Sequence, residues 1–256
     1  MLIRRALFLL GFLGTLSLAS LEAGDLPAGP AYQIVLRSRH AEATPTRTKD
    51  AQTGGGSITV EQPEPNTIVV YMYGSAVAGS DCHMSAAAVD FVLDQELEIM
   101  PLRQGVRPPR VGMVGRVVGT IQVSPCGKLH KESGSAEQGP AAATLFIDEV
   151  PLLQTVVKPS SVACGQESSV NFRHGPVEAP AVVGCYRLHS TFRIAASQGK
   201  GVFNRRYAVA DFDPAPELDA FWADALRPFR AVPRRDFGYR LVLRVVEQRA
   251  DVGAGK

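Results

Sequence analysis

Two stretches of the chain place basic side chains in a pattern that suits anion binding. In segment 186–194, Arg187, His189 and Arg193 alternate with apolar residues, and segment 239–246 repeats the pattern with Arg240 and Arg244. Alternate residues of a β-strand share one face, so each set should line one face of a sheet. Guanidinium groups bind sulfate, phosphate and carboxylate, which makes these five residues the candidate anion-binding set. The alternative is that they are solvated and paired with nearby carboxylates.

Catalytic chemistry has less support in the sequence. His189 is the candidate general base, but a His-based relay also needs a Ser or Cys nucleophile beside it. The chain contains no G-x-S-x-G elbow, H-E-x-x-H motif, phosphate-binding loop or dinucleotide fingerprint. We therefore assign no catalytic residue and predict no cofactor.

Four cysteines, Cys82, Cys126, Cys164 and Cys185, follow the N-terminal segment. An even number of cysteines in an exported chain indicates disulfides, and the sequence favours Cys82–Cys126 with Cys164–Cys185 among three connectivities. A metal site is the alternative, because histidines lie near Cys82 and Cys126, but the spacings are not those of structural zinc sites. The acidic residues 211–219 fit capping of a helix better than calcium binding, so no metal is predicted.

The N-terminus has the pattern of a secretory signal peptide. Arg4 and Arg5 precede an uncharged run from Ala6 to Leu18, and small residues end the segment near Ala23. This run is shorter than the roughly 20 residues that a spanning helix needs. We expect residues 1–23 to be cleaved and the mature protein to be periplasmic or extracellular, with no membrane span.

The remaining chain is predicted to be mainly strands. Alternation or β-branched residues indicate them, and Gly and Pro separate them. The run 47–56, with three consecutive glycines, is predicted as a loop, and 128–140 as a loop or linker. The spacing of Leu218, Phe221, Trp222 and Ala225 predicts one short helix over Pro216–Leu226. The expected strands are 32–37, 57–61, 67–73, 89–99, 111–123, 144–147, 152–157, 169–172, 186–194 and 239–246.

These elements predict an all-β protein, an antiparallel β-sandwich of about ten strands with one short helix near the C-terminus. Residues 24–256 should form a single sandwich domain, with a split into two small β domains at 128–140 as the alternative. Hydrophobic residues make up 45% of the chain and charged residues 20%, as in globular proteins. The net charge of +2 gives no reason to expect a nucleic-acid partner.

Export, strands, disulfides and missing catalytic motifs favour one function over two others. We expect an exported, non-catalytic binding or interaction module for a protein or glycan at the cell surface. The alternatives are a secreted hydrolase of extracellular polymers and a structural component of the envelope. The ligand and the oligomeric state are not encoded in any pattern of the sequence.

Overall fold

The computed structural model describes residues 29–49, 51–80, 84–125, 134–199, 206–213 and 237–248. The predicted signal peptide, Cys82, Cys126 and the predicted helix Pro216–Leu226 lie outside these ranges. The described residues contain strands and turns and no helix, and thus no helix able to cross a membrane.

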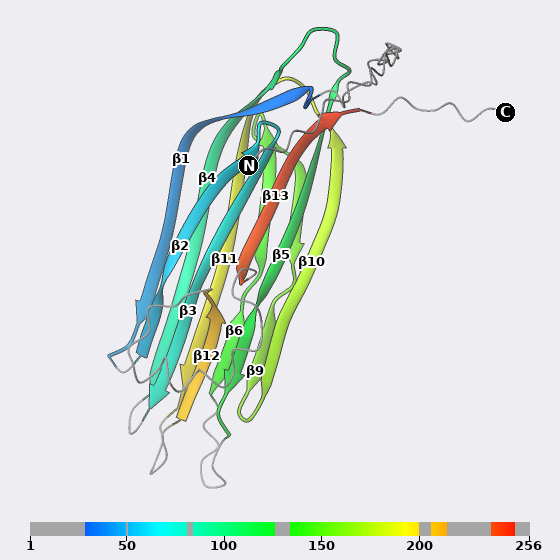
Figure 1. Cartoon of the computed structure of the whole chain (residues 1–256). Helices are drawn as coiled ribbons and strands as arrows, with labels where there is room; N and C mark the ends of the chain where they lie inside the picture. Colours follow the sequence, from blue (N-terminus) through cyan, green and yellow to red (C-terminus); the bar gives the residue numbers. More distant parts are fainter. Residues whose placement is uncertain are drawn as a thin grey trace, which may run out of the picture.

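In the described part of the chain, thirteen strands form two antiparallel sheets, as predicted for an all-β sandwich (Figure 1). Sheet A contains β1 (Tyr32–Arg47), β4 (Ser85–Pro101), β6 (Ser135–Gln138), β7 (Ala141–Ile147), β8 (Val150–Val157), β9 (Ser160–Ala163) and β11 (Gly184–Gln198). Sheet B contains β2 (Ala51–Glu64), β3 (Thr67–Ser80), β5 (Pro109–Val123), β10 (Glu167–Pro180), β12 (Arg206–Phe212) and β13 (Gly238–Glu247).

Three positions in the sheets are each filled by two short strands placed end to end. In sheet A, β6 and β7 both pair with β11. On their other side, β6 pairs with β9 and β7 pairs with β8. In sheet B, β12 and β13 both lie between β3 and β5. The thirteen strands therefore occupy ten strand positions, whereas the sequence predicts about ten strands. Each sheet contains strands that precede residues 128–140 and strands that follow them. The two halves of the chain therefore share both sheets.

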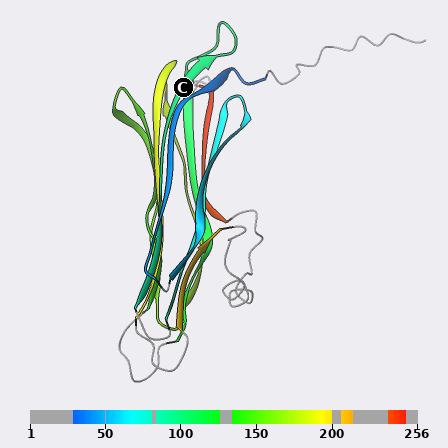
Figure 2. The same ribbon diagram turned by 90° about the vertical axis from the view of Figure 1, so that its left-hand side faces the viewer.

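The two sheets pack face to face as an elongated, two-layered molecule (Figure 2). A cluster of four aromatic rings joins the layers at its middle. Phe192 of sheet A stacks on Phe91, and its ring centroid lies 5.6 Å from that of Phe212 and 5.9 Å from that of Tyr239 in sheet B. Phe212 ends β12 and Tyr239 lies at the start of β13, so this cluster lies at the junction where the two strands meet end to end beside β3.

The run 47–56 was predicted as a loop, and that prediction is wrong for residues 51–56, which belong to a strand, whereas Thr48 and Lys49 do lie between two strands. β1 continues to Arg47 and β2 already begins at Ala51, so Gly54–Gly56 lies within a strand at the edge of sheet B. A Cβ atom on Gly56 would lie 2.7 Å from Cγ1 of Val89 in the opposite sheet. The glycine at this position permits a close approach of the two sheets and does not mark a turn.

Candidate functional site

Three of the five predicted anion-binding residues lie on the outer face of sheet A, where acidic partners neutralise them. The register of β11 against β4 places Arg187, His189 and Arg193 opposite Glu96, Asp94 and Asp90. Arg193 donates to both carboxylate oxygens of Asp90, at 3.1 and 3.3 Å, and Arg187 pairs with Glu149 at 2.7 Å. The basic face of β11 is therefore complementary to the acidic face of β4.

His189 contacts a carboxylate but lacks the rest of a catalytic relay. Its Nδ1 lies 3.0 Å from Oδ1 of Asp94, and the residue opposite it on β7 is Thr144. No hydrogen bond joins the Thr144 hydroxyl to the imidazole among the described residues, and neither residue lines the concavity described below. The Asp94–His189 contact thus acts as a cross-strand pair.

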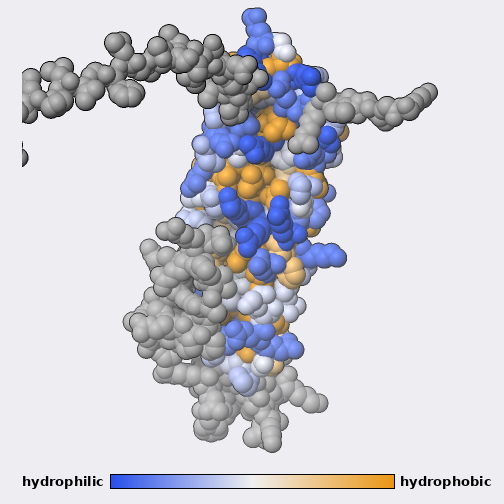
Figure 3. All heavy atoms as spheres, turned by 45° about the vertical axis from the view of Figure 1, so that its right-hand side comes forward, coloured by the Kyte–Doolittle hydropathy of each residue, from blue (hydrophilic) through white to orange (hydrophobic). Residues whose placement is uncertain are grey.

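The other two predicted residues, Arg240 and Arg244, lie on β13 at the outer face of sheet B. Arg244 forms an ion pair with Glu64 at 3.2 Å, whereas the Arg240 guanidinium lies over the ring of Tyr71, 5.7 Å from its centroid. Figure 3 brings this side of the molecule forward and shows hydrophilic and hydrophobic patches alternating along the long axis. The five predicted residues are therefore split between two sheets and do not form one site.

The predicted Cys164–Cys185 disulfide is wrong, because Cys185 is a free, exposed thiol. Cys164 directly follows β9, whose last residue is Ala163. Ala163 pairs with Ser135 of β6, and Ser135 pairs with Ser197, near the C-terminal end of β11. Cys185 lies at the opposite end of β11, roughly 40 Å away at about 3.3 Å per strand residue. A disulfide needs Cα atoms within about 7 Å of each other. The predicted Cys82–Cys126 bond involves residues outside the described ranges.

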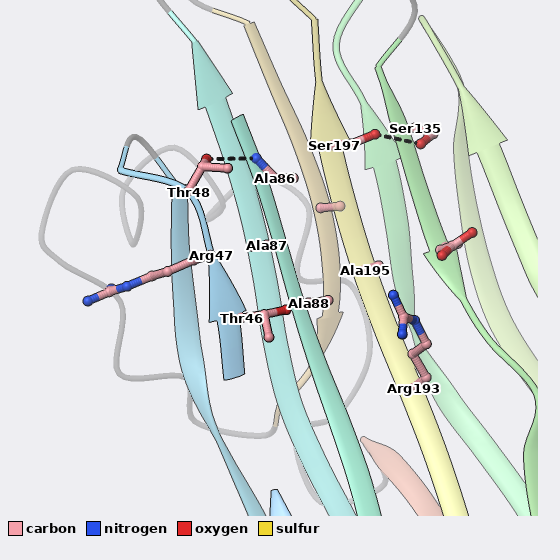
Figure 4. Close-up of a pocket in the computed structure, with 12 residues that line it drawn as sticks. Thr46, Arg47, Thr48, Ala86, Ala87, Ala88, Ser135, Arg193, Ala195 and Ser197 are labelled. Carbon is pink, nitrogen blue, oxygen red and sulfur yellow. Dashed lines mark hydrogen bonds between the residues drawn. The ribbon is translucent and has the colours of Figure 1, made fainter. Parts of the chain in front are cut away.

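The described residues form an open trough on the outer face of sheet A (Figure 4). Its volume is about 430 Å³, which falls in the range of small-ligand sites. Its floor consists of small side chains on the two central strands, since Ala88 lies opposite Ala195 and Ala86 lies opposite Ser197. Larger side chains around this floor form its walls. We call this surface the alanine trough; the wall residues are Thr46, Arg47, Thr48, Ser135, Glu137 and Arg193.

Cross-strand pairing explains why a hollow forms on an otherwise even sheet face. Thr46 of β1 lies beside Ala88, and Glu137 of β6 lies beside Ala195, so polar side chains flank methyl groups on both sides. The hydroxyl groups of Ser135 and Ser197 are 2.8 Å apart, and the Thr48 hydroxyl accepts a hydrogen bond from the Ala86 amide at 3.0 Å. In Figure 4 the Arg47 side chain extends away from the floor.

The lining of the trough is rich in groups that can form hydrogen bonds. It offers several hydroxyl groups, one carboxylate from Glu137, and the Arg193 guanidinium, whose charge is compensated by Asp90. A two-carboxylate hydrolytic mechanism needs a second acidic group beside the first, and the described lining does not supply it. No group of three or more His, Cys, Asp or Glu residues that could hold a metal was found in the described part of the chain.

Sequence reasoning missed the alanine trough because its floor carries no chemically distinctive residue. Ala86, Ala88 and Ala195 become a floor only when strands far apart in the sequence pair in register. Comparison with models of protein families and with curated proteins gave no match.

Proposed function

We propose that this protein is an exported, non-catalytic module that binds a glycan or protein ligand at the cell surface. The alanine trough is the observation that carries this proposal, because it combines a small apolar floor with hydroxyl, carboxylate and guanidinium groups at its walls. Such a surface can satisfy the many hydroxyl groups of a sugar or the backbone groups of a peptide. The N-terminal signal pattern is the reason to place the ligand outside the cytoplasm.

Filling the trough tests this proposal without altering charge. Ala195→Leu adds three carbon atoms at a half-buried position on the outer face of β11, within the floor of the trough. The variant should lose at least tenfold in affinity for any glycan or peptide that the wild-type protein retains on an array. Thr191→Leu is the matched control, since Thr191 shares this face of β11 but does not line the trough. Equal binding by both variants and the wild type would exclude the trough as the ligand site.

The export proposal includes one disulfide, between Cys126 and Cys164. The amide of Gly165, next to Cys164, donates to the carbonyl oxygens of Val123 and Ser124, both at 3.1 Å. A Cβ atom on Gly165 would lie 3.7 Å from the Cα atom of Pro125, the residue that leads directly into Cys126. The ends of β5 and β9 thus lie side by side immediately before Cys126 and Cys164 in the sequence, so we expect an oxidising compartment to join these two cysteines.

Mass analysis of the mature protein distinguishes this pairing from the one expected from the sequence. With one Cys126–Cys164 bond the mass is two hydrogens below that of the reduced chain, and a non-reducing peptide map links these two cysteines. Cys82 and Cys185 then react with a thiol reagent. A loss of four hydrogens, or a crosslinked peptide containing Cys185, would refute the pairing.

A further inference from the structure

Three arginines stand in single file across the outer face of sheet B. Arg173 of β10 pairs with Arg116 of β5, and Arg116 pairs on its other side with Arg240 of β13. Adjacent strands lie 4.7–4.9 Å apart, so the three side chains start from backbone positions with that spacing. We call these three residues the arginine row. Only Arg240 was a candidate from the sequence.

The positive charges of this row are not neutralised by carboxylates of the described residues. Arg116 donates from Nε to the neutral amide oxygen of Asn171 at 3.3 Å, and Arg240 packs over the Tyr71 ring. Other arginines of the same face differ, since Arg110 pairs with Glu178 at 3.1 Å and Arg244 with Glu64 at 3.2 Å. Like charges on directly opposed residues destabilise a sheet. Three uncompensated arginines therefore impose a cost that an anionic ligand would relieve.

An apolar strip runs beside the row. Val242 follows Arg240 by two residues on β13 and therefore lies on the same face. It pairs with Val69 of β3 on one side and with Val114 of β5 on the other. Val242 and Val114 are half-buried, so parts of their side chains reach the surface. Evenly spaced cations next to an apolar strip fit a linear polymer that carries one anionic group per repeat and presents C–H groups beside it.

We propose that the arginine row is a second binding site, distinct from the alanine trough, for an anionic polysaccharide carrying sulfate or carboxylate groups. The guanidinium fork matches both groups in bidentate geometry. A nucleic acid is less well matched, because single strands bind through free aromatic faces, and the Tyr71 face is covered by Arg240. The site lies on sheet B and the trough on sheet A, so loss of one leaves the other intact.

Titration of the full mature protein with dextran sulfate, polygalacturonate and neutral dextran tests the proposal. We expect binding to one or both anionic polymers and none to neutral dextran; the polymer that binds identifies sulfate or carboxylate as the preferred group. Arg240→Ala and Arg173→Ala should each weaken binding by about tenfold to a hundredfold, the value of one charge-assisted hydrogen bond. The slope of log affinity against log salt should also fall by about one per arginine removed.

Arg244→Ala is the matched control, because it removes one positive charge from the same strand and face but one that is already paired. It should change affinity less than twofold. Arg240→Lys keeps the positive charge but loses the forked guanidinium group, so it should bind more weakly than wild type. Because this change is conservative, weaker binding by the lysine variant would show that the loss does not come from misfolding of the alanine variants. Equal losses for Arg244→Ala and the row variants, absence of binding to both anionic polymers, or tighter binding to single-stranded DNA or to an acidic protein would each overturn the proposal.

Discussion

Gly119 illustrates how single residues set the distance between backbone and core. It lies within β5, and a Cβ atom there would lie 2.3 Å from the Phe212 ring and 2.7 Å from the carbonyl oxygen of Asp211. Neither the buried ring nor the backbone can move away without disturbing the aromatic cluster. Glycines inside strands commonly mark bulges or close backbone contacts, and Gly119 marks a close contact.

Gly119→Ala should lower the free energy of unfolding by about 1–3 kcal/mol, the usual cost of overpacking a core. Gly112→Ala serves as the control because it lies in the same strand, and its added Cβ would meet the Glu178 side chain at 3.4 Å, with no shorter contact. We expect the control to stay within about 0.5 kcal/mol of wild type in urea unfolding. If both variants unfold at the wild-type urea concentration, the packing of Phe212 on Gly119 is not as described.

The residue scale also shows why candidate chemistry was only partly predictable. The basic residues of β11 are visible in the sequence, and so are the acidic residues of β4. Their pairing depends on a register that joins positions such as Asp90 and Arg193, about a hundred residues apart. The same long-range pairing creates the arginine row and the alanine trough from residues that are unremarkable in their own segments.

At the scale of elements, the strongly alternating segments were predicted well. β4, β11 and β13 all contain the runs expected from period-two patterns, and the β2–β3 pair is present. The failures concern elements whose identity depends on a neighbour. The glycine run of β2 has little intrinsic strand preference. The register with β3 shifts between Thr53 and Gly56, and the pairs on either side, Thr53 with Ala76 and Gly56 with Gly74, continue the strand across the run.

The connection from β10 in sheet B to β11 in sheet A is fixed by a tyrosine. The Tyr186 hydroxyl donates to the Val182 carbonyl at 2.7 Å and accepts from the Val182 amide at 2.9 Å. This contact resembles the tyrosine corner of sandwich proteins, where a hydroxyl returns to backbone groups a few residues upstream. It holds the crossover against the start of β11.

Tyr186→Phe should therefore destabilise the protein by about 1 kcal/mol, the net value of a lost hydrogen bond. Faster amide exchange should be confined to residues 181–186. Tyr73→Phe is the comparison, since Tyr73 is half-buried on the outer face of sheet B. Uniformly faster exchange across both sheets would mean that the hydroxyl supports the whole sandwich instead of this crossover.

At the scale of the whole molecule, one buried tyrosine links stability to pH. Burial raises the pKa of Tyr239 from 10.0 to about 12. The unfolded chain thus releases this proton near pH 10, whereas the folded protein keeps it until about pH 12. The stabilising contribution is complete below pH 10 and is lost as the pH rises through this window, by about 2–3 kcal/mol in all.

Urea unfolding between pH 9 and pH 12 measures this loss. Tyr239→Phe has no proton to release, so its stability should fall less steeply than that of wild type across the window. The remaining slope belongs to other tyrosines whose pKa is also raised by burial, such as Tyr186. Parallel curves for the variant and wild type would contradict the assignment to Tyr239.

The two proposed sites lie on the outer faces of the two sheets, so the elongated sandwich can hold ligands on opposite sides.

The central claim is that the module binds its ligand without catalysis. Native mass spectrometry of the mature protein with a mixed library of glycans and peptides tests this claim most directly. The account predicts complexes at the mass of protein plus intact ligand, with the free ligands unchanged after prolonged incubation. Shortened ligands accumulating in the mixture, or no complex with any member of the library, would contradict it.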